Sequence, residues 1–326
     1  MLSVDFGPES IQVVKFRNDR NGQWRLQDWL EIPQGNGGVG NAPRRRWRTG
    51  WRGSFFGVRR RQAVTCVSAC DVMVREVVVP SALSGAASHP APHPASYHAS
   101  LRASHQELRD VLNSENLFPQ PLSELCVDYR QIAQVNQDSV RLSLAAAPRE
   151  VVEERIRQLA AIGLRPAAML VDAFALQHLL NHDPQRPLET DTSQLFILVD
   201  AGQFSLYVLQ AGKLMYTRRH TLKTAEVAVA AREIARAVQL FAVSSAIGGE
   251  VRLILAGSHP ALAALSDRLA ATCGLAVQVL NAGAVVAHSS RPAGSNGAGD
   301  GAGLHCLALA FAMVISVAGD RQRIVR

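Results

Sequence analysis

Aromatic residues and cysteines are scarce in this chain of 326 residues, although 48% of its residues are hydrophobic. Aromatics account for only 6%, and alanine, valine and leucine supply most of the apolar side chains. This composition favours an α/β interior over an aromatic-rich β-sandwich. The cysteines are few and odd in number, which predicts reduced, buried thiols in the cytosol rather than a disulfide framework. They are Cys66, Cys70, Cys126, Cys273 and Cys306.

No hydrophobic run is long enough to cross a bilayer. The longest runs from Cys306 to Ala318, which is shorter than the ~17–25 residues that a spanning helix needs. The chain begins MLSVDFGPES, a stretch that has no basic residues and includes the acid Asp5, so it does not resemble a secretion signal. The sequence therefore predicts a soluble protein, at most peripheral to a membrane.

One segment without acidic residues carries the positive net charge. Between Pro43 and Arg61 there are eight arginines and no acid, whereas the whole chain has a net charge of only +7. Aromatic side chains between the arginines make the segment typical of one that rests on anionic lipid, and a solvated loop is the alternative. Nucleic acid is not expected as a partner, because no second basic patch completes a footprint. The arginines assigned to the membrane surface are Arg44, Arg45, Arg46 and Arg48.

Motifs for metal binding or catalysis are missing. No Ser-His-Asp, HExxH or P-loop pattern occurs. Cys66 and Cys70 would lie about 13 Å apart in an extended chain at ~3.3 Å per residue, too far to share one zinc ion. The histidines of a Pro-broken, low-complexity stretch have no cysteine or carboxylate partners at ligand spacing, so we expect no metal site. They are His89, His93, His98 and His105.

The two halves of the chain repeat one pattern. Each opens with an apolar strand, an Asp-x-Gly turn and a second strand, with the turns at 5–7 and 200–202. A third strand and later helices follow in each half. This predicts a duplicated α/β fold with two lobes around a central cleft. Backbone N–H groups of the turns would face a phosphate chain there, with both aspartates near its metal.

The block between the halves has its own elements. Residues 125–132 and 140–147 are predicted to form a hairpin, and a helix is predicted to begin at Pro148 and to end at Gly163. A buried strand over 167–171 then leads into a helix that Asp172 caps.

These motifs resemble the actin-like ATPase superfamily, and in particular the PilM family of type IV pilus assembly proteins. The superfamily order is an Asp-x-Gly hairpin, an insert, a second Asp-x-Gly hairpin and an Ala-Gly after a strand, here Ala256-Gly257. The segment ENLFPQPLSELCVDYRQI (115–132) and the stretch 140–180 carry the PilM features: a Pro-x-Pro-Leu turn, a strand with Asp and an aromatic, and a strand that leads into an Asp followed by Ala-Leu, here Asp172-x-x-Ala175-Leu176. The resemblance covers roughly residues 1–33 and 64–318 and identifies a divergent member of the FtsA/PilM type.

The resemblance implies a ribonuclease H-like actin fold with a small inserted α+β subdomain. Its first subdomain would comprise 1–65, with the basic loop 43–61, and 164–190. The insert would comprise 66–163, and the second lobe 191–326.

The family's role implies a cytoplasmic scaffold at the inner membrane, in a pilus or DNA-uptake (competence) machine. PilM proteins bind the N-terminal tail of the membrane protein PilN within an alignment complex, in a groove beside the insert. The matching positions here are Phe118, Leu122 and Tyr129. Three alternatives stay open: an ATP-dependent switch of the same machinery, the cytoplasmic part of a type II secretion platform, and a cell-division actin homologue. The inserted block disfavours the last.

The nucleotide site that the resemblance implies departs from the family pattern. Pro8 removes a backbone N–H where phosphate would bind, Glu9 adds negative charge, and Gln12 stands where the family has a lysine. The second loop is shorter than usual, and Ala256-Gly257-Ser258 replaces a Gly-Gly. We therefore expect a vestigial site without catalysis or a required cofactor, and leave binding of ATP and Mg²⁺ open. Its residues are Asp5, Gly7, Ser10, Asp200, Gly202 and Gly257.

Overall fold

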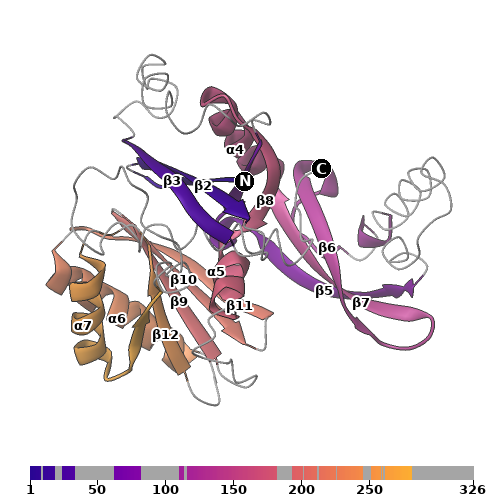
Figure 1. Cartoon of the computed structure of the whole chain (residues 1–326). Helices are drawn as coiled ribbons and strands as arrows, with labels where there is room; N and C mark the ends of the chain where they lie inside the picture. Colours follow the sequence, from indigo (N-terminus) through magenta and orange to yellow (C-terminus); the bar gives the residue numbers. More distant parts are fainter. Residues whose placement is uncertain are drawn as a thin grey trace.

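Two five-stranded sheets and one three-stranded sheet organise the computed structural model (Figure 1). The structure describes residues 1–8, 10–18, 24–33, 62–81, 110–113, 116–181, 193–200, 202–210, 213–224, 226–244, 251–257, 259 and 261–280. The predictions for the arginine segment, the histidine stretch and the apolar run 306–318 lie outside these residues. None of the helices in the described ranges is long and apolar enough to cross a membrane.

The first sheet has the strand order β3-β2-β1-β4-β8. Its strands are β1 (Leu2–Phe6), β2 (Ser10–Asn18), β3 (Trp24–Pro33), β4 (Gln62–Val67) and β8 (Arg165–Val171). The first three strands pair antiparallel, and β4 is parallel to both of its neighbours. The central strands β1 and β4 are apolar and buried, as expected for strands covered on both faces.

The second sheet repeats this order as β11-β10-β9-β12-β13. Its strands are β9 (Ser193–Asp200), β10 (Gln203–Gln210), β11 (Lys213–Thr221), β12 (Val251–Ala256) and β13 (Val277–Val279). Two helices, α6 (Val227–Ser244) and α7 (Leu262–Cys273), pack against one face of this sheet in a shared apolar cluster. The strand orders of the two lobes match, which confirms the predicted duplication.

The third sheet is inserted between β4 and β8. A 3₁₀ turn, η2 (Ala69–Asp71), leads from β4 into β5 (Met73–Pro80), and η3 (Leu122–Glu124) precedes β6 (Leu125–Gln134) and β7 (Ser139–Pro148). The order is β5-β7-β6, all antiparallel. In Figure 1 this sheet extends to one side of the first sheet. Pro148 ends β7 and caps the next helix, α4 (Arg149–Ala161), so the predicted helix start is early by one residue.

The helix α5 (Asp172–Asn181) lies between the two large sheets (Figure 1). Its buried side chains, among them Leu176 and Leu179, pack in one cluster with Phe196, Leu198 and Tyr207 of the second sheet. The same cluster contains residues of β2, β4 and β8. The two lobes therefore share a continuous apolar core, and the polar groups between them are positioned by packing on both sides.

Candidate functional site

The first Asp-x-Gly turn lies at the end of β1. Asp5 is partly buried and is paired in register with Gln12 of β2, whose side chain is buried in the sheet. Pro8 is exposed in the turn. The hydroxyl of Ser10 donates a hydrogen bond of 2.7 Å to the Glu31 carboxylate on β3. Of the residues assigned to phosphate binding here, Ser10 thus already has an intramolecular partner.

The second Asp-x-Gly turn and the loop after β12 lie against each other. Asp200 ends β9, and Gly202 in the turn has a φ of +73°. Gly257 has a φ of +128°, and a Cβ atom there would lie 2.0 Å from the carbonyl oxygen of Val199. The backbone N–H of His259 donates to the same oxygen at 3.2 Å. The glycine thus lets the loop after β12 approach the end of β9, beside Asp200.

The carboxylates of the two turns are close enough to interact electrostatically. Burial, followed by the negative charges of Asp200 and Asp172, raises the pKa of Asp5 to about 7, while Arg155 acts in the opposite direction. The Arg155 guanidinium comes from α4 and lies 4.7 Å from the centroid of the Phe6 ring. A protein cation thus lies near the first turn and offsets part of the negative charge.

Two groups at the first turn are not free to contact a phosphate. Within the parts of the chain that the structure describes, no three His, Cys, Asp or Glu side chains are grouped to hold a metal ion. The Ser10 hydroxyl is bonded to Glu31, and Pro8 has no N–H to offer a phosphate. We therefore derive no reaction step through a nucleotide.

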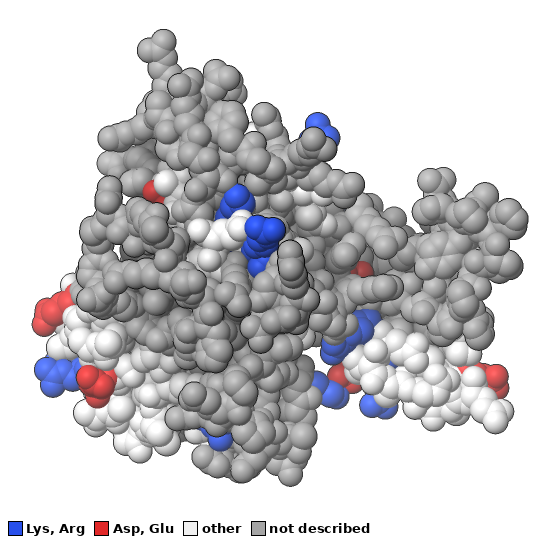
Figure 2. Space-filling view, in the orientation of Figure 1, with Lys and Arg blue, Asp and Glu red and all other residues white. Residues whose placement is uncertain are grey.

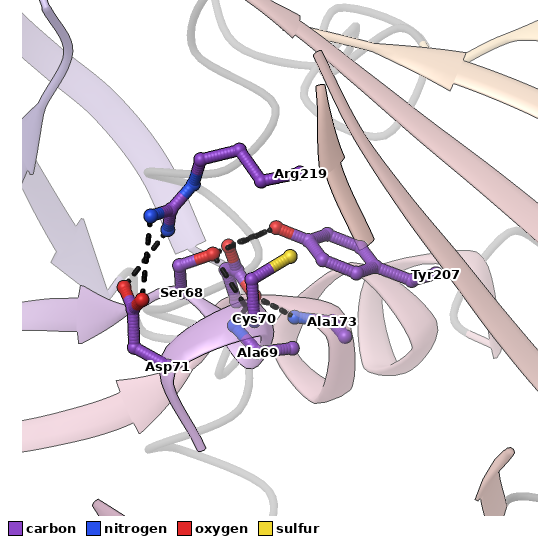
Figure 3. Close-up of polar contacts among 8 residues, drawn as sticks. Ser68, Ala69, Cys70, Asp71, Ala173, Tyr207 and Arg219 are labelled. Carbon is purple, nitrogen blue, oxygen red and sulfur yellow. Dashed lines mark hydrogen bonds and ion pairs between the residues drawn. The ribbon is translucent and has the colours of Figure 1, made fainter. Parts of the chain in front are cut away.

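A second polar cluster lies between the lobes, around Asp172 (Figure 3). Asp172 is the first residue of α5 and is 3% exposed. Its Oδ1 accepts hydrogen bonds from the N–H groups of Ala69 at 2.7 Å and Ala173 at 2.6 Å, and its Oδ2 accepts one from the Tyr207 hydroxyl at 2.6 Å. The Tyr207 and Ser68 oxygens are 3.1 Å apart. One carboxylate therefore collects donors from both lobes.

The pKa values of this cluster follow from its burial. Burial raises the pKa of Asp172 to about 6, although the hydrogen bonds from Tyr207, Ala69 and Ala173 counteract part of the effect. Burial and the neighbouring Asp172 raise the pKa of Tyr207 well above its usual value, so the hydroxyl stays protonated and donates. Burial also raises the pKa values of the nearby thiols Cys66 and Cys70.

Two ion pairs join β11 to the insert and the turn before it. Arg219 forms a bidentate pair with Asp71 of η2, with N–O distances of 2.8 and 3.3 Å, and its hydrogen bonds to Asp71 raise the pKa of Arg219. Lys213 lies 2.8 Å from the Glu76 carboxylate on β5. These pairs are partly exposed and extend the contacts of the Asp172 cluster toward the surface.

The sequence did not single out Tyr207, Arg155 or Arg219. Tyr207 offered the best signal, because it lies in a predicted strand of mostly apolar residues, and the hydroxyl of a buried tyrosine usually has a partner. Asp172 was predicted to cap a helix; it is the first residue of α5, and its Oδ1 accepts from the N–H of the adjacent Ala173. Its contact with Tyr207 joins residues 35 positions apart, and local patterns do not encode such pairing.

The residues assigned to a partner groove gather in the insert. Leu122 is 6% exposed in the apolar cluster on one face of the inserted sheet, and the partly buried Phe118 and Tyr129 pack against that cluster. Burial raises the pKa of Tyr129. The structure thus places the three side chains in one cluster, with Leu122 in its interior and the two aromatics nearer its surface.

The membrane-surface arginines Arg44, Arg45, Arg46 and Arg48 lie outside the described residues. On the face drawn in Figure 2, the Lys, Arg, Asp and Glu side chains of the described residues are scattered and form no broad area of one sign.

One family model and two solved structures are similar to this chain. Residues 96–228 match the model of a family described as "Type IV pilus assembly protein PilM". A solved PilM-PilN type IV pilus biogenesis complex contains a chain with 18% identity and a TM-score of 0.65, over 98% of both chains. The cytoplasmic domain of EpsL, an inner membrane component of the type II secretion system of Vibrio cholerae, has 11% identity and a TM-score of 0.46, over 100% of this chain and 97% of that domain. The predicted actin-like fold is confirmed, as is the resemblance to the PilM family.

Proposed function

Because the chain is PilM-like with an actin-like fold, we propose that it is a scaffold subunit of type IV pilus assembly, at the cytoplasmic side of the inner membrane. The observation that carries this proposal is the match to the PilM family over residues 96–228, which contains β6, β7, α4, β8 and α5. A DNA-uptake machine that uses the same assembly proteins would need the same subunit.

The proposed partner is the N-terminal tail of a PilN-like membrane protein. The solved relative is itself a complex of PilM with PilN, which supports this choice. In the described part of the insert, β6 is at the edge of its sheet, since the order is β5-β7-β6. An extended tail that pairs with a strand edge gains backbone hydrogen bonds, and neighbouring side-chain pockets provide specificity. Phe118 and Tyr129 would line such a pocket.

We propose a scaffold rather than an enzyme because the Asp-x-Gly turns are poorly equipped for chemistry. The exposed Pro8 and the Ser10–Glu31 hydrogen bond support this conclusion.

Binding of a fluorescent peptide with the tail sequence of the cognate PilN-like protein tests the proposal. We expect Tyr129→Glu and Phe118→Glu to weaken binding about tenfold or more, because aromatic anchors dominate small interfaces. Arg130→Glu is the matched control, since Arg130 is exposed and points to the other face of β6. Leu122 is unsuitable as a test position, because a charge in its buried site would unfold the insert.

Thermal denaturation of each variant must show that the fold is intact. Unchanged affinity in both aromatic variants would place the groove elsewhere. If the wild-type protein does not bind the peptide at all, the proposed partner is wrong.

A further inference from the structure

We propose that Asp172, Tyr207 and Ser68 form a latch that holds the two lobes together without any bound ligand. Nucleotide-binding proteins with two lobes can use the bound phosphates to join them. Here the protein's own groups make the connection (Figure 3). The inference rests on the geometry between the lobes and does not depend on the proposed role in pilus assembly.

The carboxylate of Asp172 is shared between the lobes. Oδ1 accepts from two backbone N–H groups, that of Ala69 in the turn η2 and that of Ala173 in α5. Oδ2 accepts the hydroxyl of Tyr207, which belongs to β10 of the second lobe. The O–O distance of 2.6 Å is in the range of hydrogen bonds to an ionised acceptor, which are roughly twice as strong as neutral ones.

Loss of the Tyr207–Asp172 bond while the lobes stay packed would leave buried groups without a partner. Tyr207 is 0% exposed and Asp172 is 3% exposed. A buried donor or acceptor that loses its partner bears its full desolvation cost, which makes such bonds difficult to break one at a time. Separation of the lobes would also divide the apolar cluster around α5, because it contains side chains of both sheets.

Two partly exposed ion pairs lie beside the latch. Arg219 of β11 reaches Asp71, which lies in the turn that also supplies Ala69. Lys213, at the other end of β11, pairs with Glu76 of β5. The start of β11 contacts β5, and its end contacts η2, which precedes β5 in the chain. Both ends of β11 are therefore held. The second lobe is thereby attached to the first lobe and to the insert together.

Hydrogen exchange of the full chain in nucleotide-free buffer tests the latch. Tyr207→Phe removes the hydroxyl and keeps the ring, so we expect amides of 66–74 to exchange about tenfold faster or more. Tyr216→Phe is the matched control. Its ring packs against Phe241 of α6 at 4.8 Å, on the opposite face of the second sheet, and it should leave this segment unchanged.

A second pair of variants covers the possibility that Tyr207→Phe does not fold. Arg219→Gln breaks only a partly exposed ion pair, and we expect exchange about two- to fivefold faster in 66–74. The adjacent Arg218→Gln should have no effect there, because Arg218 is exposed and lies on the other face of β11.

Either of two results would overturn the latch. One is equal exchange in the Tyr207 and Tyr216 variants, or in the Arg219 and Arg218 variants if the first pair cannot be measured. The other is wild-type exchange in 66–74 that slows tenfold or more when MgATP or MgADP is added, because the lobes would then need a nucleotide to close.

Discussion

Gly257 has a structural role that its neighbour in the site, Gly202, does not share. Both have positive φ angles, but only at Gly257 would a Cβ atom collide with backbone, 2.0 Å from the Val199 carbonyl oxygen. Gly202 has nothing within 4 Å of its Cβ position. We expect Gly257→Ala to lower the free energy of unfolding by more than about 3 kcal/mol, through strain and displacement of β9.

The Gly202→Ala variant serves as the control for conformational strain alone. We expect a loss of about 1–2 kcal/mol, the usual cost of a left-handed conformation for a residue with a Cβ. Urea denaturation of both variants provides the comparison. Equal losses would mean that the loop after β12 relaxes away from β9, contrary to the close packing described above.

Asp5 should make the fold less stable as pH rises. Its pKa in the folded protein is about 7, against 3.8 as its reference value. The unfolded chain therefore releases this proton at lower pH than the folded chain does. Between pH 4 and 7 the folded state binds more protons, so the free energy of unfolding falls with rising pH. Since each pKa unit corresponds to about 1.4 kcal/mol, the full effect is at most about 4 kcal/mol.

Asp5→Asn should remove this dependence. We expect the variant to gain stability relative to the wild type on going from pH 5 to pH 8, by up to about 3 kcal/mol. Denaturant titrations at the two pH values measure the difference. Asp267→Asn, at an exposed position of α7, is the control that should show no such change. A constant difference between Asp5→Asn and wild type would show that Asp5 is not in the unfavourable environment assigned to it.

Single residues of the turns could be predicted from sequence, but their partners could not. Asp5, Asp200 and Gly257 follow apolar strands in a recurring pattern, and the structure brings their segments together. The contacts of Arg155 and Tyr207 depend on how α4 and β10 pack against distant elements. Packing of that kind is set by side-chain shape across the whole core, and local sequence patterns do not report it.

At the level of elements, the strands were predicted more reliably than their pairing registers and the turns that join them. β1 and β9 are bounded by Asp-x-Gly turns, and β5 ends at Pro80, so local turn chemistry fixed their ends. The predicted hairpin of β6 and β7 extends one or two residues further at three of its four ends, because backbone pairing continues past the apolar run. The register shift between Gln131 and Ala133 had no signal in the sequence.

The turn η2 shows what element prediction missed. The chain between Cys66 and Cys70 was treated as extended, and a zinc site there was excluded on that basis. The structure places a 3₁₀ turn there, and this turn supplies Ala69 to Asp172 and Asp71 to Arg219. A short connection thus joins three parts of the molecule. Its importance lies in contacts far away in sequence, so no local pattern could reveal it.

At the scale of the whole molecule, duplication explains why the two lobes have the same strand order, and the latch explains how they are held together. The two lobes have the same strand order, so each could have kept a turn for one side of a phosphate chain. Instead, the described residues between them form a continuous apolar core and a shared carboxylate. A protein that serves as a scaffold benefits from such a fixed arrangement, because its partner surfaces keep their relative positions without a bound cofactor.

We predict that MgATP does not raise the melting temperature of the protein. A ligand that binds only the folded state adds RT ln(1 + [L]/Kd) to its stability, about 2.7 kcal/mol at one hundred times Kd. At about 5 mM MgATP, a functional site with a micromolar Kd would therefore raise the melting temperature by several degrees. We expect no measurable shift, because the Ser10 hydroxyl is bonded to Glu31 and Pro8 has no N–H to offer a phosphate.

Asp200→Ala decides what any observed shift would mean. A shift that is equal in this variant and in the wild type would reflect weak binding elsewhere and would leave the scaffold proposal intact. An upward shift in the wild type that Asp200→Ala abolishes would show that the paired turns bind nucleotide. Such a result would favour the ATP-dependent switch, since binding at Asp200 would then add stability that the shared core and Asp172 do not provide.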